Sequence, residues 1–348
     1  MTVDAPPIRR LSPRTTGIVL LCALLAAAAL SLTLGAVSVP FSAAVLALPD
    51  ALFGLGMSSL EGYQRAVMLE LRVPRTLLAI VVGGLLAQCG AVMQGLFRNP
   101  LADPGIIGVS AGAALGAAMA IFFLPHAGES IVLPLAAFAG GFLTSMIVYS
   151  LARDVRGTSV VLLLLAGVAI SALSGGAIAL LSYLSDDERL RDISFWQMGS
   201  LGRAGDALLG VLALTAVAVA LRFQMRARAL NALLLGESEA RHLGIPVEWL
   251  KLELIVLVAL GVGLAVSACG LIGFVGLVVP HMLRMLCGPD YRVLLPLSAL
   301  GGALLLIVAD GLSRSLMAPA EVPVGIVTAL IGAPFFMLLL LQVRRRGL

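Results

Sequence analysis

The chain has 348 residues, of which 60% are hydrophobic and only 12% are charged, and its mean hydropathy is +1.07. Soluble globular domains carry about twice that charged fraction, so this composition argues against a soluble enzyme or a soluble nucleic-acid-binding protein. The formal net charge of +4 is therefore attributed to membrane topology.

Apolar runs recur along the chain, and a helix of about 20 residues crosses the ~30 Å hydrocarbon core of a bilayer. Backbone groups in lipid must be hydrogen-bonded within their own segment, so these runs predict helices. The predicted spans are residues 16–38, 68–95, 105–124, 131–152, 159–184, 206–222, 251–268, 273–287, 293–315 and 324–343. The sequence thus predicts an all-α polytopic membrane protein of about ten transmembrane helices, with residues 1–348 forming a single permease-like domain.

The distribution of basic residues predicts the orientation. Most of the 23 arginines and lysines fall in segments that lie on the same side as the N-terminus if ten helices cross the membrane. By the positive-inside rule this side is the cytoplasm, and both termini are cytoplasmic. The expected location is the inner membrane of a bacterium, with residues 1–15 as a cytoplasmic tail. The first apolar run is interpreted as a retained helix, because it is too long for a typical signal peptide.

Three arginines near the ends of predicted spans fall on the outer side, against this rule. Arg72 and Arg75 open the second span in the string LRVPR, and Arg314 ends the ninth in ADGLSR. Arginine near a membrane is costly unless it is paired or reaches water. One interpretation is an ion pair between Asp310 and Arg314, which are four residues apart on a helix. The other is an outward surface on which these arginines bind carboxylates of an extracytoplasmic partner.

The predicted third span contains a regular series of glycines. Gly108, Gly112 and Gly116 repeat every four residues, which places them on one face of a helix. Such a face allows a second helix backbone to approach closely.

The longest polar interruption on the inner side runs from Arg222 to Lys251, and we assign residues 223–250 to short helices on the cytoplasmic surface. Asn231 is expected to cap a short helix that Gly236 ends, and Glu237 or Ser238 to begin a second helix that Gly244 ends. One interpretation is a plain amphipathic connection. The other is a docking element for a cytoplasmic protein, because the segment mixes charges with apolar Leu233, Leu234 and Leu243.

The remaining motifs offer no catalytic chemistry. Pro280 within the run 270–284 is expected to free a backbone carbonyl and kink its helix. His281 beside it is interpreted as structural, because metal sites usually gather several ligands and none cluster here. The sequence has no Walker motif, no HExxH and no GxSxG. Its acidic residues lie near span ends, which argues against a proton relay at the membrane centre.

These strings, taken together and in this order, resemble the FecCD family of permeases from type II ABC importers of iron-siderophores, haem and cobalamin. The resemblance covers nearly the whole chain from about residue 64 and depends on the combination of motifs. The matching strings are LRVPR (71–75), GAVMQGLFRNPLADPGIIGVSAGA (90–113), LLAGVAI (164–170), FWQMGSL (195–201), LNALLLGESEARHLGI (230–245), GLIGFVGLVVPHMLR (270–284), ADGLSR (309–314) and EVPVGIVTALIGAPFF (321–336).

The resemblance implies the type II ABC importer permease fold, a homodimer with the translocation path at its interface, two cytoplasmic ABC ATPase subunits and a periplasmic substrate-binding protein. ATP and Mg would be bound by the ATPase, and this chain would hold no cofactor or metal and have no catalytic site. The residues implied to couple to the ATPase are Asn231, Gly236, Glu237, Glu239, Ala240, Arg241, Leu243 and Gly244. Those implied to dock the binding protein are Arg72, Arg75 and Arg314.

The same resemblance is closer to the haem-uptake branch than to the cobalamin branch, so haem import is the expected function. Import of an iron-siderophore or of cobalamin by the same mechanism is the main alternative. A proton-coupled secondary transporter and an intramembrane enzyme are alternatives of other classes. Uptake that requires ATP and the binding protein would separate the importer from both.

Overall fold

The computed structural model describes residues 11–345 except 36, 38, 54–57, 61, 125–129, 155–156 and 203–205. Residues 1–10 of the predicted cytoplasmic tail lie outside the described residues. The described chain enters its first helix at Pro13, three residues before the predicted start of the first span.

The elements in chain order are α1 (Pro13–Ser31), α2 (Phe41–Phe53), α3 (Gly62–Ala66), the π-helical η1 (Val67–Arg72), α4 (Val73–Leu96), the 3-10 helix η2 (Pro104–Ile107), α5 (Val109–Phe123), α6 (Val132–Ala152), β1 (Arg153–Asp154), β2 (Gly157–Thr158), α7 (Val160–Leu184), α8 (Asp187–Met198), α9 (Asp206–Leu235), α10 (Glu237–His242), α11 (Val247–Cys269), α12 (Val275–Cys287), α13 (Tyr291–Ser315) and α14 (Val324–Arg345). The two strands form an antiparallel hairpin in which Arg153 pairs with Thr158.

Helices of membrane-spanning length dominate the described chain. Seven segments are long and apolar enough to cross a membrane: α1, the continuous segment from α3 to α4, α6, α7, α9, α11 and α13. The shorter apolar helices α5, α12 and α14 add three more. These ten segments correspond to the ten predicted spans, which confirms the predicted polytopic helical fold.

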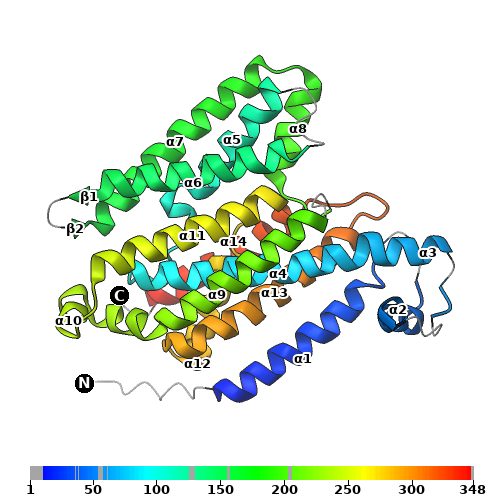
Figure 1. Ribbon diagram of the computed structural model, residues 1–348, viewed down its shortest axis with the longest axis horizontal. Helices are drawn as coiled ribbons and strands as arrows, with labels where there is room; N and C mark the ends of the chain where they lie inside the picture. Colours follow the sequence, from blue (N-terminus) through cyan, green and yellow to red (C-terminus); the bar gives the residue numbers. More distant parts are fainter. Residues whose placement is uncertain are drawn as a thin grey trace.

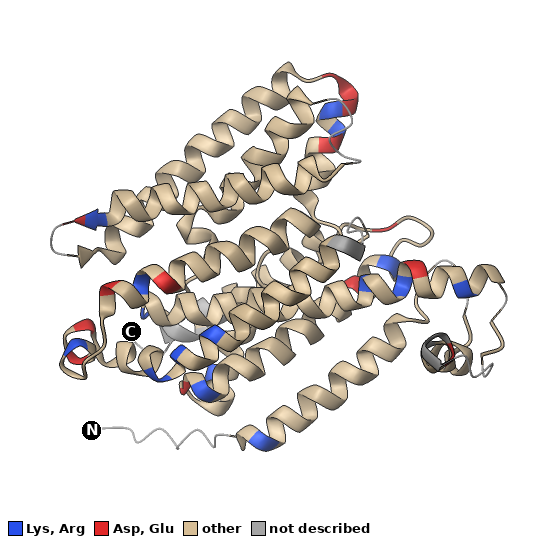
Figure 2. Ribbon diagram, in the orientation of Figure 1, with Lys and Arg blue, Asp and Glu red and all other residues tan. Residues whose placement is uncertain are grey.

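The helices run back and forth between two ends of the bundle (Figure 1). One end carries α10 and the β1–β2 hairpin and is called the α10 end, and the other carries α3 and α8 and is called the α8 end. Charged residues gather near these ends, and the middle of the bundle is largely free of them (Figure 2). A central band without charge is what a bilayer requires of a spanning bundle.

Three parts of the fold differ from the sequence prediction. Helices α2 and α8 occupy segments predicted as loops, and the β1–β2 hairpin is a small exception to an all-helical chain. The predicted sixth span ends at residue 222, whereas α9 continues to Leu235. The arginines that suggested an end are tolerated within this helix because Arg222 and Arg226 both form ion pairs with Glu253 of α11.

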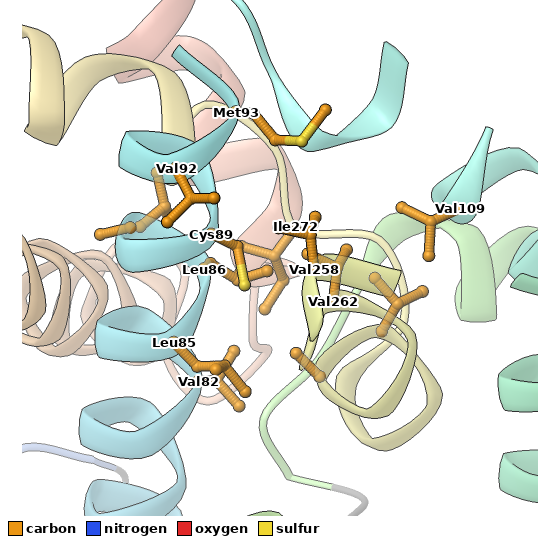
Figure 3. Packing of buried hydrophobic residues seen from close by; sticks show 14 of the residues in the cluster. Val82, Leu85, Leu86, Cys89, Val92, Met93, Val109, Val258, Val262 and Ile272 are labelled. Atoms are coloured by element: carbon orange, nitrogen blue, oxygen red, sulfur yellow. The ribbon is translucent and has the colours of Figure 1, made fainter. Parts of the chain in front are cut away.

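The core is centred on α4. Its side chains Val82, Leu85 and Cys89 pack against Val258 and Val262 of α11 (Figure 3). All five are at most 2% exposed. Because interiors are close-packed, this contact fixes the spacing of the two helices.

Glycines set the closest helix contacts. A Cβ atom on Gly112 would lie 2.5 Å from the carbonyl oxygen of Gly140, and one on Gly116 would lie 2.2 Å from that of Ala136. The predicted small-residue face of the third span therefore does pack closely on another helix, which is α6.

Pro280 was expected to free a backbone carbonyl in α12, and a side chain of α4 donates to that carbonyl. Proline removes the hydrogen bond that the carbonyl of Gly276 would otherwise accept within α12. The Nε2 atom of Gln94 on α4 lies 3.4 Å from the Gly276 oxygen and 3.2 Å from the Leu277 oxygen, and donates to both. The amide of Gln94 thus supplies a donor that the proline cannot.

Candidate functional site

The α8 end contains a pocket of about 470 Å3 whose lining includes all three arginines singled out in the sequence. Arg72, Arg75 and Arg314 meet there although they come from η1, α4 and α13. Glu70 and Glu321 also line the pocket. We call this site the arginine pocket.

Arg72 forms one wall of the arginine pocket. The residue is only 5% exposed. Its Nη1 atom donates to the carbonyl oxygen of Leu32 at 2.7 Å, and its Nη2 atom donates to the carbonyl oxygen of Val37. Arg72 therefore fixes the backbone between α1 and α2, and these two bonds use two of its five N–H donors.

Arg314 has a similar structural role. It is 5% exposed. Its Nη1 atom donates to the Leu34 carbonyl oxygen at 2.8 Å, its Nη2 atom donates to Ser31 Oγ at 2.7 Å, and its Nε atom lies 3.0 Å from Asp310 Oδ2. The guanidinium joins the end of α13 to the end of α1.

Arg75 joins these groups to the surface. Its Nε atom donates to Asp310 Oδ1 at 2.8 Å, and its Nη1 atom donates to Glu321 Oε2 at 2.8 Å. The side chain of Arg75 is 13% exposed and that of Glu321 is 49% exposed, whereas that of Asp310 is 1% exposed. The buried carboxylate of Asp310 is therefore shared between two arginines.

This arrangement bears on the two interpretations of the outer arginines. The predicted ion pair between Asp310 and Arg314 is present, and Arg75 forms a second ion pair with Asp310. Arg72 and Arg314 are 5% exposed and bind acceptors within the protein, as a buried arginine must, and docking of a binding protein on the three arginines stays a prediction. Arg75, whose side chain is 13% exposed, is the most accessible of the three arginines to a partner.

The α10 end has a protruding helix with the predicted boundaries. Gly236 has a φ of +124° and separates α9 from α10, which begins at Glu237. Gly244 has a φ of +80°. The amide of Gly244 donates to the Arg241 carbonyl oxygen and that of Ile245 to the Ala240 carbonyl oxygen, which is a Schellman motif. Left-handed backbone at this position favours glycine.

Asn231 has a different place from the one predicted. It lies within α9 and caps no helix that ends at Leu235. Its Nδ2 atom donates to Asp290 Oδ1 at 2.6 Å, and its Oδ1 atom accepts from the Tyr291 amide at 2.8 Å. Asn231 therefore holds the N-terminus of α13 against α9. The error follows from treating α9 as broken at residue 222.

Asp290 at this contact has a perturbed acidity. Hydrogen bonds from Arg292 and Asn231 stabilise its carboxylate and hold its pKa at about 2. Arg292 pairs with it at 2.8 Å, and the side chain of Asp290 is 38% exposed.

The surface around α10 is partly apolar. Leu235, Leu243 and Trp249 are 69%, 65% and 72% exposed. Glu239, Arg241 and Gly244 are also exposed, Ala240 is fully buried, and Glu237 forms ion pairs with Arg241 at 3.4 Å and with Lys251 at 2.7 Å. We call the surface of Leu235, Glu239, Arg241, Leu243 and Trp249 the α10 surface.

Two residues of the α10 surface, Leu235 and Trp249, were not predicted from the sequence. Leu233 was expected there but is 3% exposed, because it continues the buried face of α9 that includes Phe223, Ala227 and Leu230. Leu235 lies beyond that face. If the helical periodicity had been continued past residue 222, it would have predicted Leu233 as buried and Leu235 as exposed. Trp249 lies in the first turn of α11, inside the segment 223–250 that was assigned to the cytoplasmic surface but outside the residues expected to contact the ATPase.

A larger cavity of a different kind lies elsewhere. A groove of about 1000 Å3 between α1, α12 and α13 is lined by aliphatic side chains, methionine, glycine and three hydroxyl residues, Ser12, Thr15 and Thr16. No charged group lines it in the part of the chain that the structure describes. It offers apolar surface to lipid but no set of polar groups that could orient a ligand.

Comparison with known proteins agrees with these features. Residues 20–342 match the FecCD transport family. The chain is 48% identical over 283 residues to the hemin transport system permease protein HmuU of Yersinia pestis, covering 80% of this chain and 84% of that protein. It is 40% identical over 331 residues to the vitamin B12 import system permease protein BtuC of Vibrio vulnificus, covering 94% of each.

A solved structure has the same fold. A metal-chelate type ABC transporter in an inward-facing conformation superimposes with a TM-score of 0.79 at 34% sequence identity. The match covers 95% of this chain and 100% of the other.

Proposed function

The chain belongs to the FecCD transport family and is a permease of an ABC importer, and on that premise we propose that its substrate is haem. The observation that carries the choice of haem is the 48% identity to a hemin permease. Cobalamin is the second candidate, because permeases for vitamin B12 are 40% identical over a larger share of the chain. Import of an iron-siderophore is a third candidate within the same mechanism.

In this proposal ATP and Mg are bound by two partner ATPase subunits, and the permease contributes no catalytic group. The α10 end faces the cytoplasm of a bacterial inner membrane, as the basic residues in its loops predict. The permease acts as a homodimer with the substrate path at its interface. Helix α7 suits such an interface, because only a small part of its apolar span is buried within the chain.

We propose that the α10 surface binds the ATPase. Its exposed leucines and tryptophan can insert into an apolar groove, and burial of one such side chain contributes roughly 1.5–3 kcal/mol. Glu239 and Arg241 beside them provide charges of both signs, which suits a protein partner better than an anionic lipid surface. Of the residues implied by the family resemblance, Gly236, Glu237, Ala240 and Gly244 shape α10, whereas Glu239, Arg241 and Leu243 are available for contact.

We propose that the arginine pocket receives a carboxylate of the periplasmic binding protein. Asp310 is fully buried between Arg75 and Arg314, so it remains within the permease. Glu321 is half-exposed and pairs with the accessible edge of Arg75. An incoming carboxylate would therefore take the place of Glu321 at Arg75, where a guanidinium edge can bind it through paired hydrogen bonds.

The proposal is tested in proteoliposomes that contain the permease, its ATPase and its binding protein. Haem, cyanocobalamin and a ferric siderophore are supplied separately, and both uptake and ATP hydrolysis are measured. Haem is expected to accumulate and to stimulate hydrolysis only when ATP and the binding protein are both present. Stimulation by another ligand alone would overturn haem as substrate, and uptake by the permease without ATPase would overturn the ATP-driven mechanism.

A further inference from the structure

A buried lysine lies beneath α10. Lys251 is in the second turn of α11, and its side chain is only 2% exposed. Its Nζ atom donates to Glu237 Oε2 at 2.7 Å, to the Thr158 carbonyl oxygen at 2.9 Å and to Glu248 Oε1 at 3.3 Å. The three acceptors belong to α10, β2 and α11. They match the three donors of an ammonium group.

Glu248 of α11 also binds Thr158 of β2 directly. Its Oε2 atom accepts from the Thr158 amide at 2.8 Å and from Thr158 Oγ1 at 2.9 Å. Gly157 of the same strand leaves little space, since a Cβ atom there would lie 2.7 Å from Glu248 Oε1. We call the set of Thr158, Glu237, Glu248 and Lys251 the Lys251 junction.

The Lys251 junction connects α10 to the start of α7. Thr158 is followed by Ser159, whose Oγ atom accepts from the Leu162 amide and caps α7. Figure 1 shows the β1–β2 hairpin and α10 at the same end of the molecule. A displacement of Glu237 with α10 would therefore pull on the backbone of β2 at Thr158, two residues before the first residue of α7.

Simple packing does not explain a lysine at this position. Removing an ammonium group from water costs several kcal/mol, and an apolar side chain of similar volume would often stabilise such a site equally well. A charged group with three acceptors on different segments instead fixes their relative positions, because each hydrogen bond has a preferred length and direction.

We propose that Lys251 is a positioning residue that transmits the movement of α10 to α7. The inference rests on the proposed function, in which the ATPase acts on the α10 surface. The movement of the partner would reach α10 at Glu237, pass through the ammonium group to the Thr158 carbonyl, and shift the start of α7. Loss of the lysine would then leave a permease that binds the ATPase but responds weakly to it.

The first test measures coupling in the reconstituted complex with Lys251→Met. Methionine keeps an unbranched apolar stem, and the carboxylates left behind at Glu237 and Glu248 are 27% and 38% exposed, so they can reach water and the variant is expected to fold. Transport per ATP hydrolysed is expected to fall by roughly tenfold, within the usual range of coupling between sites. ATPase binding and hydrolysis are expected to remain close to wild type.

Two further variants separate transmission from a general structural role. Arg228→Gln changes an exposed cation on α9 and is expected to leave transport per ATP unchanged. Lys251→Arg keeps the charge but replaces a compact ammonium by a planar fork, and is expected to restore coupling only in part. An equal fall of transport and hydrolysis in Lys251→Met, with coupling unchanged, would overturn the inference.

The second test measures movement directly. Spin labels are placed at exposed Val161 in the first turn of α7 and at exposed His242 of α10, in a background in which the accessible Cys22 and Cys287 are replaced by alanine. In nanodiscs with the permease alone, Lys251→Met is expected to broaden the distance between the labels. With the ATPase bound, addition of ATP is expected to move the Val161 label in wild type and not in the variant.

The outcomes distinguish the two proposals. If the wild-type permease binds no ATPase, the proposed function fails, and the label distances in the permease alone still test the Lys251 junction. An unchanged distance distribution in Lys251→Met, or full movement of the Val161 label after ATP, would overturn the role of Lys251.

Discussion

The two ends of the bundle use charged residues in opposite ways. In the arginine pocket, Asp310 and two of its three arginines are at most 5% exposed and bind one another or the backbone. At the α10 end most of the described charged side chains are on the surface, beside exposed leucines and a tryptophan, whereas Lys251 is buried. One end therefore presents a preformed charged pocket, and the other presents an apolar projection. The difference suggests a charge-directed partner on one side and a partner bound by apolar contact on the other.

The largest effect is expected where a buried ion pair is broken. Arg314→Leu removes the cation that joins Asp310 to Ser31, and breaking a buried pair in this way typically costs about 3–5 kcal/mol. Because Asp310 keeps Arg75, we expect a loss of stability near the lower limit, measured as the thermal unfolding midpoint of the purified permease. The matched control is Arg189→Leu, which removes an exposed partner of the exposed Asp186 and should cost less than about 1 kcal/mol. Equal effects of the two variants would contradict the contrast drawn between buried and exposed pairs.

The next effect concerns partner binding at the α10 end. Leu243→Asp is expected to weaken binding of the ATPase by roughly ten- to a hundredfold, because it removes about 1.5–3 kcal/mol of apolar burial. Binding is measured with the purified permease in nanodiscs. Leu190→Asp on α8 makes the same change at 41% exposure at the other end. It should leave ATPase binding unchanged, and a similar loss in both variants would contradict the assignment of the α10 surface.

In the arginine pocket, two substitutions are expected to change the docking of the binding protein by a smaller amount and in opposite directions. Glu321→Gln removes the competitor for Arg75 and should tighten docking of the binding protein by up to about fivefold, as exposed pairs contribute roughly 0.2–1 kcal/mol. Arg75→Gln should weaken docking. Both differences should shrink at high salt because exposed charges are screened. Docking that is unaffected by either variant at low salt would count against the pocket as the binding surface.

The smallest effect is the pH dependence contributed by Asp290. Its pKa is lowered to about 2 from 3.8, so its carboxylate stabilises the fold above 3.8, and this contribution is lost as the pH falls from 3.8 towards 2. The side chain is 38% exposed, which keeps the contribution small. The unfolding midpoint of Asp290→Asn should lie slightly below that of wild type at pH 5, and the gap should narrow by pH 3 and close only near pH 2. A gap that is constant with pH would show that Asp290 acts only through neutral hydrogen bonds.

The sequence was sufficient for the features that depend on local pattern. Spans follow from runs of apolar residues, because an unpaired backbone is not tolerated in lipid. The boundaries of α10 at Gly236 and Gly244 follow from the backbone freedom of glycine. The small-residue face of Gly112 and Gly116 follows from helical periodicity, whereas Gly108, predicted on the same face, precedes α5 with a φ of +77°. Each depends on residues close together in the chain.

The errors came from contacts between distant segments. The end of the sixth span at residue 222 was wrong because Glu253 of α11 neutralises Arg222 and Arg226 within the bundle. Asn231 was assigned to a local cap, whereas its partners Asp290 and Tyr291 come from another helix. The couplings proposed for the ATPase and the binding protein stay predictions.

By itself, the sequence determined that the protein is a bundle of membrane-spanning helices, where its polar interruptions lie and which family it resembles. Only the tertiary structure decided that Arg72, Arg75 and Arg314 surround one pocket, that Asp310 is shared, and that Lys251 is buried under α10. The physical reason is that hydropathy and backbone preference act within one or two turns of a helix. The partner of a buried charge is chosen instead by the packing of helices that are far apart in the chain.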